Sequence, residues 1–86
     1  MTNDAIIDMI TQLLHARADD ASICPSEVAR ALAPEHWRDL MPQVRAVAAE
    51  LAIAGTLRIT QGPADIAPTA VLTGQTRGPI RLRRRH

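Results

Sequence analysis

Residues 23–33 read "ICPSEVARALA", and the local chemistry of this stretch predicts the start of a helix. If Cys24 is the N-cap, Pro25 takes the first helical position, where the N–H that proline lacks has no helical partner to lose. Glu27 then stands at the third position, from which its carboxylate reaches back to the N–H of the cap, as in a capping box. The stretch therefore predicts a short helix over about residues 25–33.

The residues around this helix start allow two candidate N-cap residues. Ile23 precedes Cys24, and Val28 follows at the fourth helical position, which matches a hydrophobic staple. A thiol replaces the hydroxyl of the usual cap, so the capping bond to sulfur should be weak. Ser26 is the alternative cap. With either cap the helix ends near Pro34, because proline disfavours helical geometry in the residue before it.

Apolar residues at helical spacing predict one helix on each side of this segment. Upstream, "TNDAIIDMITQLLHAR" predicts a helix over about residues 4–17. Downstream, "MPQVRAVAAELAIAG" predicts a helix over about residues 40–54, with Gly55 as its C-terminal stop. Pro42 is tolerated only near the first turn of a helix, so the preceding "EHWRDL" is expected to form a separate turn or a distorted lead-in.

After Gly55 the apolar residues alternate with polar ones, and this period of two predicts strands. "TLRITQG" predicts a strand over about residues 56–61, and "PIRLRRR" predicts one over about residues 79–84. Between them, "GPADIAPT" is expected to turn, and "AVLTGQTRGP" is partly strand-like. The two strands are expected to form an antiparallel hairpin with one buried face, and "SI" at residues 22–23 is a candidate third strand.

This order of elements predicts an α+β fold, a winged helix-turn-helix in which three helices are followed by a two- to three-stranded antiparallel β-hairpin, the wing. We expect one domain over residues 1–86. The segments "ICPSEVARAL", "HWRDLMPQVRAVAAEL", "AGTLRITQG" and "RGPIRLRRR" resemble, in this order and spacing, a family of small uncharacterised bacterial domains. The resemblance covers about residues 5–85 and implies a winged-helix plan without an assigned catalytic residue. The longer "GPADIAPTAVLTGQT" departs from a compact wing.

The composition limits what such a domain can do. Apolar residues make up 47% of the chain, but Trp37 is the only aromatic and many apolar positions are alanine, so the core is too small to enclose a deep catalytic cavity. No apolar stretch approaches the roughly 20 residues that cross a bilayer, and acids stand where a signal peptide carries positive charge. A single cysteine excludes an internal disulfide. We therefore expect a soluble, cytoplasmic protein that does not bind membranes.

The net charge of +1 hides an uneven distribution of charge along the chain. Residues 1–55 contain four arginines and eight acidic residues, whereas residues 56–86 contain six arginines and one acidic residue, which gives −4 and +5. A genome-wide bias toward arginine explains the absence of lysine, but it does not explain why the arginines gather at one end. Such an asymmetry often marks a domain with one face for polyanions.

We therefore expect weak, salt-dependent binding of DNA or RNA, because guanidinium groups form paired hydrogen bonds with phosphates. The candidate contacts in the hairpin are Arg58, Arg77, Arg81, Arg83, Arg84 and Arg85. Arg45 and Gln43 on the longer helix are lesser candidates, since the alanines around them cannot form hydrogen bonds with base edges. Sequence-specific recognition is accordingly not expected.

An alternative hypothesis is a protein interaction or dimerisation module that does not bind nucleic acid. Its support is an apolar strip of Ala46, Ala49 and Ile53 on the solvent face of the longer helix. Small residues allow two helices to approach closely, and a two-fold homodimer or another protein partner would bury this strip. The competing interpretation is that the hairpin folds back and covers it.

The sequence offers little for catalysis or metal binding. Cys24 at a helix start is a candidate nucleophile, with His15 or His36 as its base, but no third residue orients them. A residue held against the core explains Cys24 more simply. These three residues also lack the spacing of a zinc site. We therefore expect a non-enzymatic domain with no cofactor and no metal.

Overall fold

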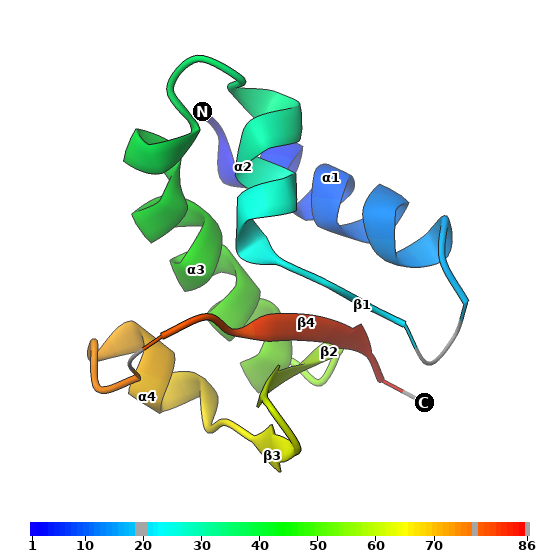
Figure 1. The fold of residues 1–86 in the computed structure, drawn as a ribbon, viewed down its shortest axis with the longest axis vertical. Helices are drawn as coiled ribbons and strands as arrows, with labels where there is room; N and C mark the ends of the chain where they lie inside the picture. The colour runs from blue at the N-terminus through cyan, green and yellow to red at the C-terminus, as the bar shows by residue number, and fades with distance from the viewer. Residues whose placement is uncertain (19–20, 77, 86) are drawn as a thin grey trace.

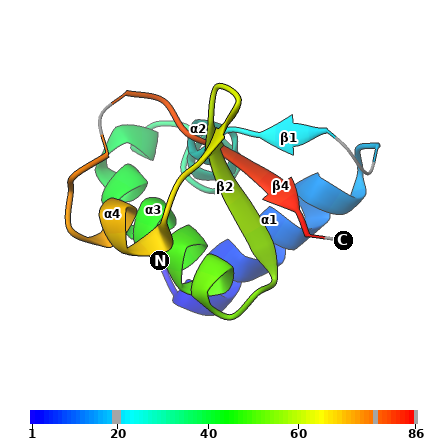
Figure 2. The same cartoon turned by 90° about the horizontal axis from the view of Figure 1, so that it is seen from below.

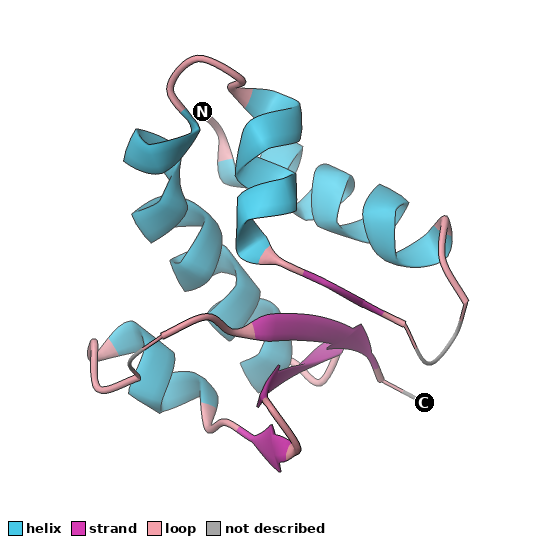
Figure 3. Cartoon of the chain, in the orientation of Figure 1, coloured by secondary structure: helices cyan, strands magenta, loops and turns pink. Residues whose placement is uncertain are grey.

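The computed structural model of the chain describes residues 1–18, 21–76 and 78–85. In it, the three longer helices pack together on one side of an antiparallel sheet (Figure 1). The elements follow in the order α1 (Asn3–His15), β1 (Ser22–Ile23), α2 (Pro25–Leu32), α3 (Trp37–Ile53), β2 (Leu57–Gln61), β3 (Ala64–Asp65), α4 (Pro68–Leu72) and β4 (Arg81–Arg84). Figure 3 shows the strands gathered below α1, α2 and the first half of α3. This separation gives the sheet one face toward the helices and one face toward solvent.

The sheet places its final strand between two earlier ones. Its order is β1–β4–β2–β3, and all neighbouring strands are antiparallel (Figure 2). Leu82 of β4 lies opposite Ile23 of β1 and opposite Ile59 of β2, so three apolar side chains cross the sheet in one row. The candidate strand at residues 22–23 is therefore confirmed as β1. The α+β fold predicted from the sequence is confirmed as well, and its plan is compatible with a small winged helix.

The core lies between the inner face of the sheet and the three longer helices. α1 begins where the Thr2 hydroxyl oxygen accepts a hydrogen bond from the N–H of Ala5 at 3.2 Å. From this start the helix buries one stripe at helical spacing, as its sequence predicts. The large side chains that are almost fully buried are Ile6, Ile10, Ile23, Val28, Val44, Leu57, Ile59, Ile80 and Leu82. The alternation of apolar residues along β2 and β4 thus supplies one half of the core, and the helical stripes supply the other.

α3 begins earlier than the sequence pattern predicts. It runs over Trp37–Ile53 and contains Pro42, so the expected separate turn before this proline is part of the helix. Pro42 lacks the N–H that would bond to the carbonyl of Arg38. The first turn instead gains packing from the half-buried Trp37 ring, whose centroid lies 4.3 Å from the guanidinium carbon of Arg30 and 5.0 Å from that of Arg38. Tertiary contacts therefore outweigh the cost of a proline within the helix.

The segment between β2 and β4 also differs from the prediction of a turn followed by a partly strand-like stretch. Its residues form the short strand β3 and the helix α4, which packs on α3 (Figure 1). Pro68 stands at the first position of α4, where its missing N–H costs nothing. Gly74 follows the helix with a φ of 73°, which ends it. The half-buried Val71 packs against the core, a long-range contact that alternation in the sequence cannot reveal.

Candidate nucleic-acid interface

The start of α2 holds the end of α1 and the beginning of β1 together. Cys24 is the N-cap, and its N–H donates a hydrogen bond to Oε2 of Glu27 at 2.7 Å. Arg17 forms an ion pair with the same carboxylate and also donates to the carbonyl oxygen of Ser22 at 3.0 Å. The prediction that Cys24 caps the helix and that Glu27 reaches back to it is confirmed, and the alternative cap, Ser26, is wrong.

The Glu27 carboxylate makes the stability of the fold depend on pH. Hydrogen bonds from Arg17 and then from the N–H of Cys24 hold the pKa of Glu27 below its usual range, although partial burial acts in the opposite direction. A glutamate whose pKa is lowered in the folded state stabilises that state. The effect is complete at pH values above the pKa of the same glutamate in the unfolded chain, which is about 4.3. This contribution is lost as the pH falls through the lowered, folded-state pKa. We therefore expect Glu27→Gln to lower Tm near neutral pH and to change it less in acid.

Thermal unfolding followed by circular dichroism, at a series of pH values from neutral to acid, measures this effect. Glu50→Gln is the matched control, because Glu50 is exposed on α3. The difference in Tm between the parent and Glu27→Gln should shrink as the pH falls, while the difference for Glu50→Gln stays small throughout. A Glu27→Gln difference that does not change with pH would contradict the assigned role of the ion pair.

Arg81 is bonded to the edge of the sheet. Its Nε donates to the hydroxyl oxygen of Ser22 at 2.8 Å, and its two terminal nitrogens donate to Cys24 Sγ at 2.6 Å and to the carbonyl oxygen of Ser22 at 3.2 Å. The residue is half-buried. Arg81 was predicted to be a nucleic-acid contact; in the structure its hydrogen bonds fix β4 against β1 and against the start of α2.

Arg58 and Arg83 lie directly opposite each other on β2 and β4. Because Leu57 and Ile59 on either side of Arg58 are buried, the Arg58 side chain points away from the core, and it is exposed. Arg83 is half-buried, and its Nε donates to the hydroxyl oxygen of Thr60 at 3.2 Å. Like charges that face each other across two strands destabilise a sheet. An anion bound between them would remove this cost.

Arg17 adds a fourth arginine to the outer face of the sheet. It donates to the same Ser22 carbonyl oxygen as Arg81, and Ser22 lies opposite Arg83. We call Arg17, Arg58, Arg81 and Arg83 the arginine face. Arg17 is not among the residues predicted from the sequence, because it stands in the acidic half of the chain. The sequence does contain one indication of its position. Arg17 stands shortly before the predicted strand at residues 22–23, and this strand, β1, pairs with the arginine-rich β4.

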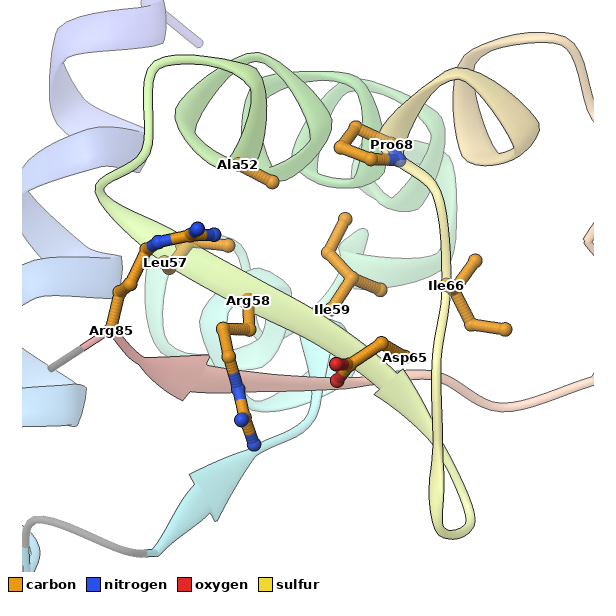
Figure 4. A pocket seen from close by; sticks show the side chains of 8 residues that line it. All are labelled: Ala52, Leu57, Arg58, Ile59, Asp65, Ile66, Pro68 and Arg85. Atoms are coloured by element: carbon orange, nitrogen blue, oxygen red, sulfur yellow. The ribbon is translucent and has the colours of Figure 1, made fainter.

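A shallow cleft borders the arginine face beside β2. Its lining residues are Ala52, Leu57, Arg58, Ile59, Asp65, Ile66, Pro68 and Arg85. Arg58 and Arg85 both line the cleft; in Figure 4 the Arg58 side chain extends toward β1, whereas the Arg85 side chain extends toward Leu57. The two guanidinium groups therefore do not converge on one point, as the binding of a small anion would require. The basic surface is extended along the strands.

Two other arginines predicted in the hairpin lie near the end of α1. Arg84 and Arg85 line a groove with His15 at the end of α1. Arg84 is half-buried and Arg85 is exposed. Arg77 lies outside the described residues. The structure thus brings together Arg58, Arg81 and Arg83 of the predicted set, and Arg85 shares the cleft beside β2 with Arg58.

The two candidates on α3 have other surroundings. Gln43 donates hydrogen bonds to the carbonyl oxygen of Met1 at 2.7 Å and to Oδ1 of Asn3 at 3.0 Å, so it fastens the N-terminus to α3. Arg45 is half-buried and lines a groove between α3 and α4. Neither side chain belongs to the arginine face.

The apolar strip expected on α3 is not continuous at the surface. Ala49 is 0% exposed and Ala46 is half-buried, whereas Ile53 is 59% exposed. Ala46 lines the groove with residues of α4, and Ala52 lines the cleft with Pro68. α4 therefore lies over part of this side of α3, whereas Ile53 stays exposed. The cover comes from the helix between the two hairpin strands, and not from the strands of the hairpin.

Three further findings concern catalysis and membranes. The Cys24 thiol is half-buried, and its sulfur accepts a hydrogen bond from Arg81. Within the residues that the structure describes, no three or more His, Cys, Asp or Glu side chains group as a metal site would require. In the same residues, no helix combines the length and the apolar character needed to cross a membrane.

Comparison with models of protein families identifies the family of this chain, and the function of that family is not established. No curated protein matches the sequence. The family model described as a protein of unknown function, DUF3253, matches residues 3–85. This match spans almost the whole chain and confirms the resemblance to a family of small domains without an established role. The chain therefore belongs to the DUF3253 family.

Proposed function

We propose that this domain binds the phosphate backbone of DNA or RNA weakly through the arginine face. The observation that supports this function best is the direct opposition of Arg58 and Arg83 on neighbouring strands. Two guanidinium groups in this arrangement repel each other in the isolated domain. Phosphates bound to both groups would relieve the repulsion, because guanidinium groups form bidentate hydrogen bonds with phosphate oxygens.

The hydrogen bonds of the arginine face limit how many phosphates it can contact. Arg17 is neutralised by its ion pair with Glu27, and Arg81 is bonded to β1 and Cys24, so Arg81 contributes mainly to the local positive potential. The exposed Arg58 is the principal contact, and Arg83 opposite it is the second, through guanidinium N–H groups other than the Nε–H that it donates to Thr60. Each phosphate that a cation neutralises lowers the slope of log K against log salt by about 0.9, so we expect a slope of about −2 to −3.

The surroundings of α3 support backbone contact without reading of base sequence. In many winged helices the third helix enters the major groove and contacts base edges. Here α4 packs on α3, and Gln43 is bonded to the N-terminal residues. Alanine side chains form no hydrogen bonds with base edges. We therefore expect similar affinity for unrelated sequences of the same polymer.

On this proposal the domain is a non-enzymatic helix-turn-helix-type protein that acts on DNA or RNA in the cytoplasm. Cys24 then serves as the cap of α2 and as a hydrogen-bond acceptor for Arg81. No cofactor takes part, because contact between arginines and phosphates needs none.

Titration of fluorescently labelled duplex DNA and structured RNA at several salt concentrations tests the proposal. Arg58→Ala/Arg83→Ala should weaken binding at low salt by about tenfold or more and reduce the salt slope by about 2, as expected for two lost phosphate contacts. Arg38→Ala/Arg45→Ala is the matched control, because it removes the same charge from α3 outside the arginine face.

Two results would contradict this function. Equal loss of affinity in both double variants would show that net charge alone decides binding and that the arginine face has no special role. Absence of binding to either polymer at about 50 mM salt, where phosphate contacts are strong, would rule out the function itself. A comparison of the two polymers also shows which one the face prefers.

A further inference from the structure

A groove between the first half of α3 and α4 lies apart from the arginine face. Its lining residues are Arg38, Met41, Pro42, Arg45, Ala46, Val71, Leu72 and Gly74. The half-buried side chains of Met41 and Val71 make its floor apolar. Leu72 at its rim is 45% exposed. A single exposed leucine is ordinary on a protein surface, but this one borders an apolar hollow that a side chain of another molecule can fill.

The charges of this groove select an anionic occupant. Arg38 and Arg45 are seven residues apart, about two helical turns, so both guanidinium groups emerge on the same side of α3. No acidic residue is among the lining residues. Within the described part of the chain, neither arginine forms an ion pair. The groove thus combines an apolar floor with two cations that lack a carboxylate partner.

Pro42 and Arg38 both line the groove. Because proline has no N–H, the carbonyl oxygen of Arg38 lacks its usual helical donor four residues further along. A peptide can supply an N–H donor, carboxylates and aliphatic side chains together. A fatty acid has no donor to offer when it is ionised, and a nucleic-acid strand has no aliphatic side chain to fill the floor. Among these occupants, a peptide matches the groove best.

We propose that the α3–α4 groove docks a segment of a partner protein that carries acidic residues beside one or two aliphatic side chains. The aliphatic side chains would fill the floor between Met41 and Val71, and the carboxylates would pair with Arg38 and Arg45. Complementary charge of this kind directs the choice of partner and the rate of association. Since the groove shares no residue with the arginine face, this docking is independent of the nucleic-acid proposal.

Selection of a random peptide library displayed on phage against the full 86-residue chain tests the groove without a presumed sequence. The enriched peptides should combine Asp or Glu with Leu, Ile or Val. Synthetic copies of these peptides are then titrated against the ¹⁵N-labelled protein. The amide resonances that shift should be those of the first half of α3 and of α4, and the resonances of β2 and β4 should stay in place.

Point variants show whether both the charge and the apolar rim are used. Arg45→Glu and Leu72→Ser should each weaken peptide binding by about tenfold, since one reverses a cation and the other removes apolar area. Because Leu72 is 45% exposed, its substitution should leave the fold intact, and a circular dichroism spectrum of the variant checks this. Arg30→Glu makes the same charge change as Arg45→Glu at a residue that does not line the groove, and it should leave binding almost unchanged.

Several outcomes would overturn the docking proposal. These are enrichment of peptides without acidic residues, resonance shifts away from α3 and α4, equal binding by Arg45→Glu, and no enrichment at all. Sedimentation that shows a dimer, disrupted by Arg45→Glu, would assign the groove to a second copy of this chain and would also overturn it. Nucleic-acid binding that is lost in Arg45→Glu would assign the groove to that polymer instead.

Discussion

Leu82→Ala is expected to lower the free energy of unfolding by about 3–4 kcal/mol, which is a large part of the stability of a domain this small. Leu82 is 0% exposed and lies in β4, between Ile23 of β1 and Ile59 of β2. The substitution removes apolar area from the core and leaves a cavity where the sheet packs on the helices. Because β4 is hydrogen-bonded on both sides, its backbone cannot move inward to fill that cavity.

Urea denaturation of the parent and the variant measures the difference directly. Leu72→Ala is the matched control, since it removes the same atoms from a side chain that is 45% exposed, and it should cost much less. The slope of free energy against urea should stay similar if both proteins unfold in two states. Equal losses from the two substitutions would show that Leu82 is not part of the core.

Ala49→Glu is expected to lower Tm by about 15 °C or more, since a domain of this size loses about 4–8 °C for each kcal/mol. Ala49 is 0% exposed on α3, three residues from Ala46 and from Ala52, which line hollows together with residues of α4. A glutamate there either buries an unpaired carboxylate or forces α4 away from α3, and both are costly. If the strip of Ala46, Ala49 and Ile53 were instead an exposed dimer interface, this substitution would weaken the dimer while the fold survived.

Ile53→Asp provides the comparison, because Ile53 is 59% exposed on the same helix. Thermal unfolding of both variants should show a large loss of Tm for Ala49→Glu and a small one for Ile53→Asp. If Ala49→Glu unfolds at the same temperature as the parent, then α4 does not cover this side of α3.

The parts of the fold that depend on neighbouring residues could be predicted from the sequence. The order Cys24, Pro25, Glu27 is enough to set the start of α2, because capping acts over three residues. Alternation around Ile59 and Leu82 likewise determines which face of each strand is buried. These features would be much the same in many tertiary settings.

The parts that depend on distant contacts could not be predicted. α4 forms on α3, and the local sequence of its residues had suggested a turn and a strand. Arg17 bonds to Ser22, and Ser22 lies opposite Arg83 only because β1 pairs with β4. Hydrogen bonds to Ser22 and Cys24 hold the Arg81 side chain in place on the sheet. Each of these depends on strand order, which a periodic pattern does not specify.

The central position of β4 has a consequence for synthesis on the ribosome. The hydrogen bond from Arg81 to Ser22 joins residues 59 apart, and β1 and β2 have no direct pairing to each other before β4 enters between them. Closing so long a loop is slow, and apolar strand surface stays uncovered until then. While residues 81–84 are still inside the exit tunnel, the nascent chain should therefore depend on chaperones, and its sheet should form only once β4 has emerged.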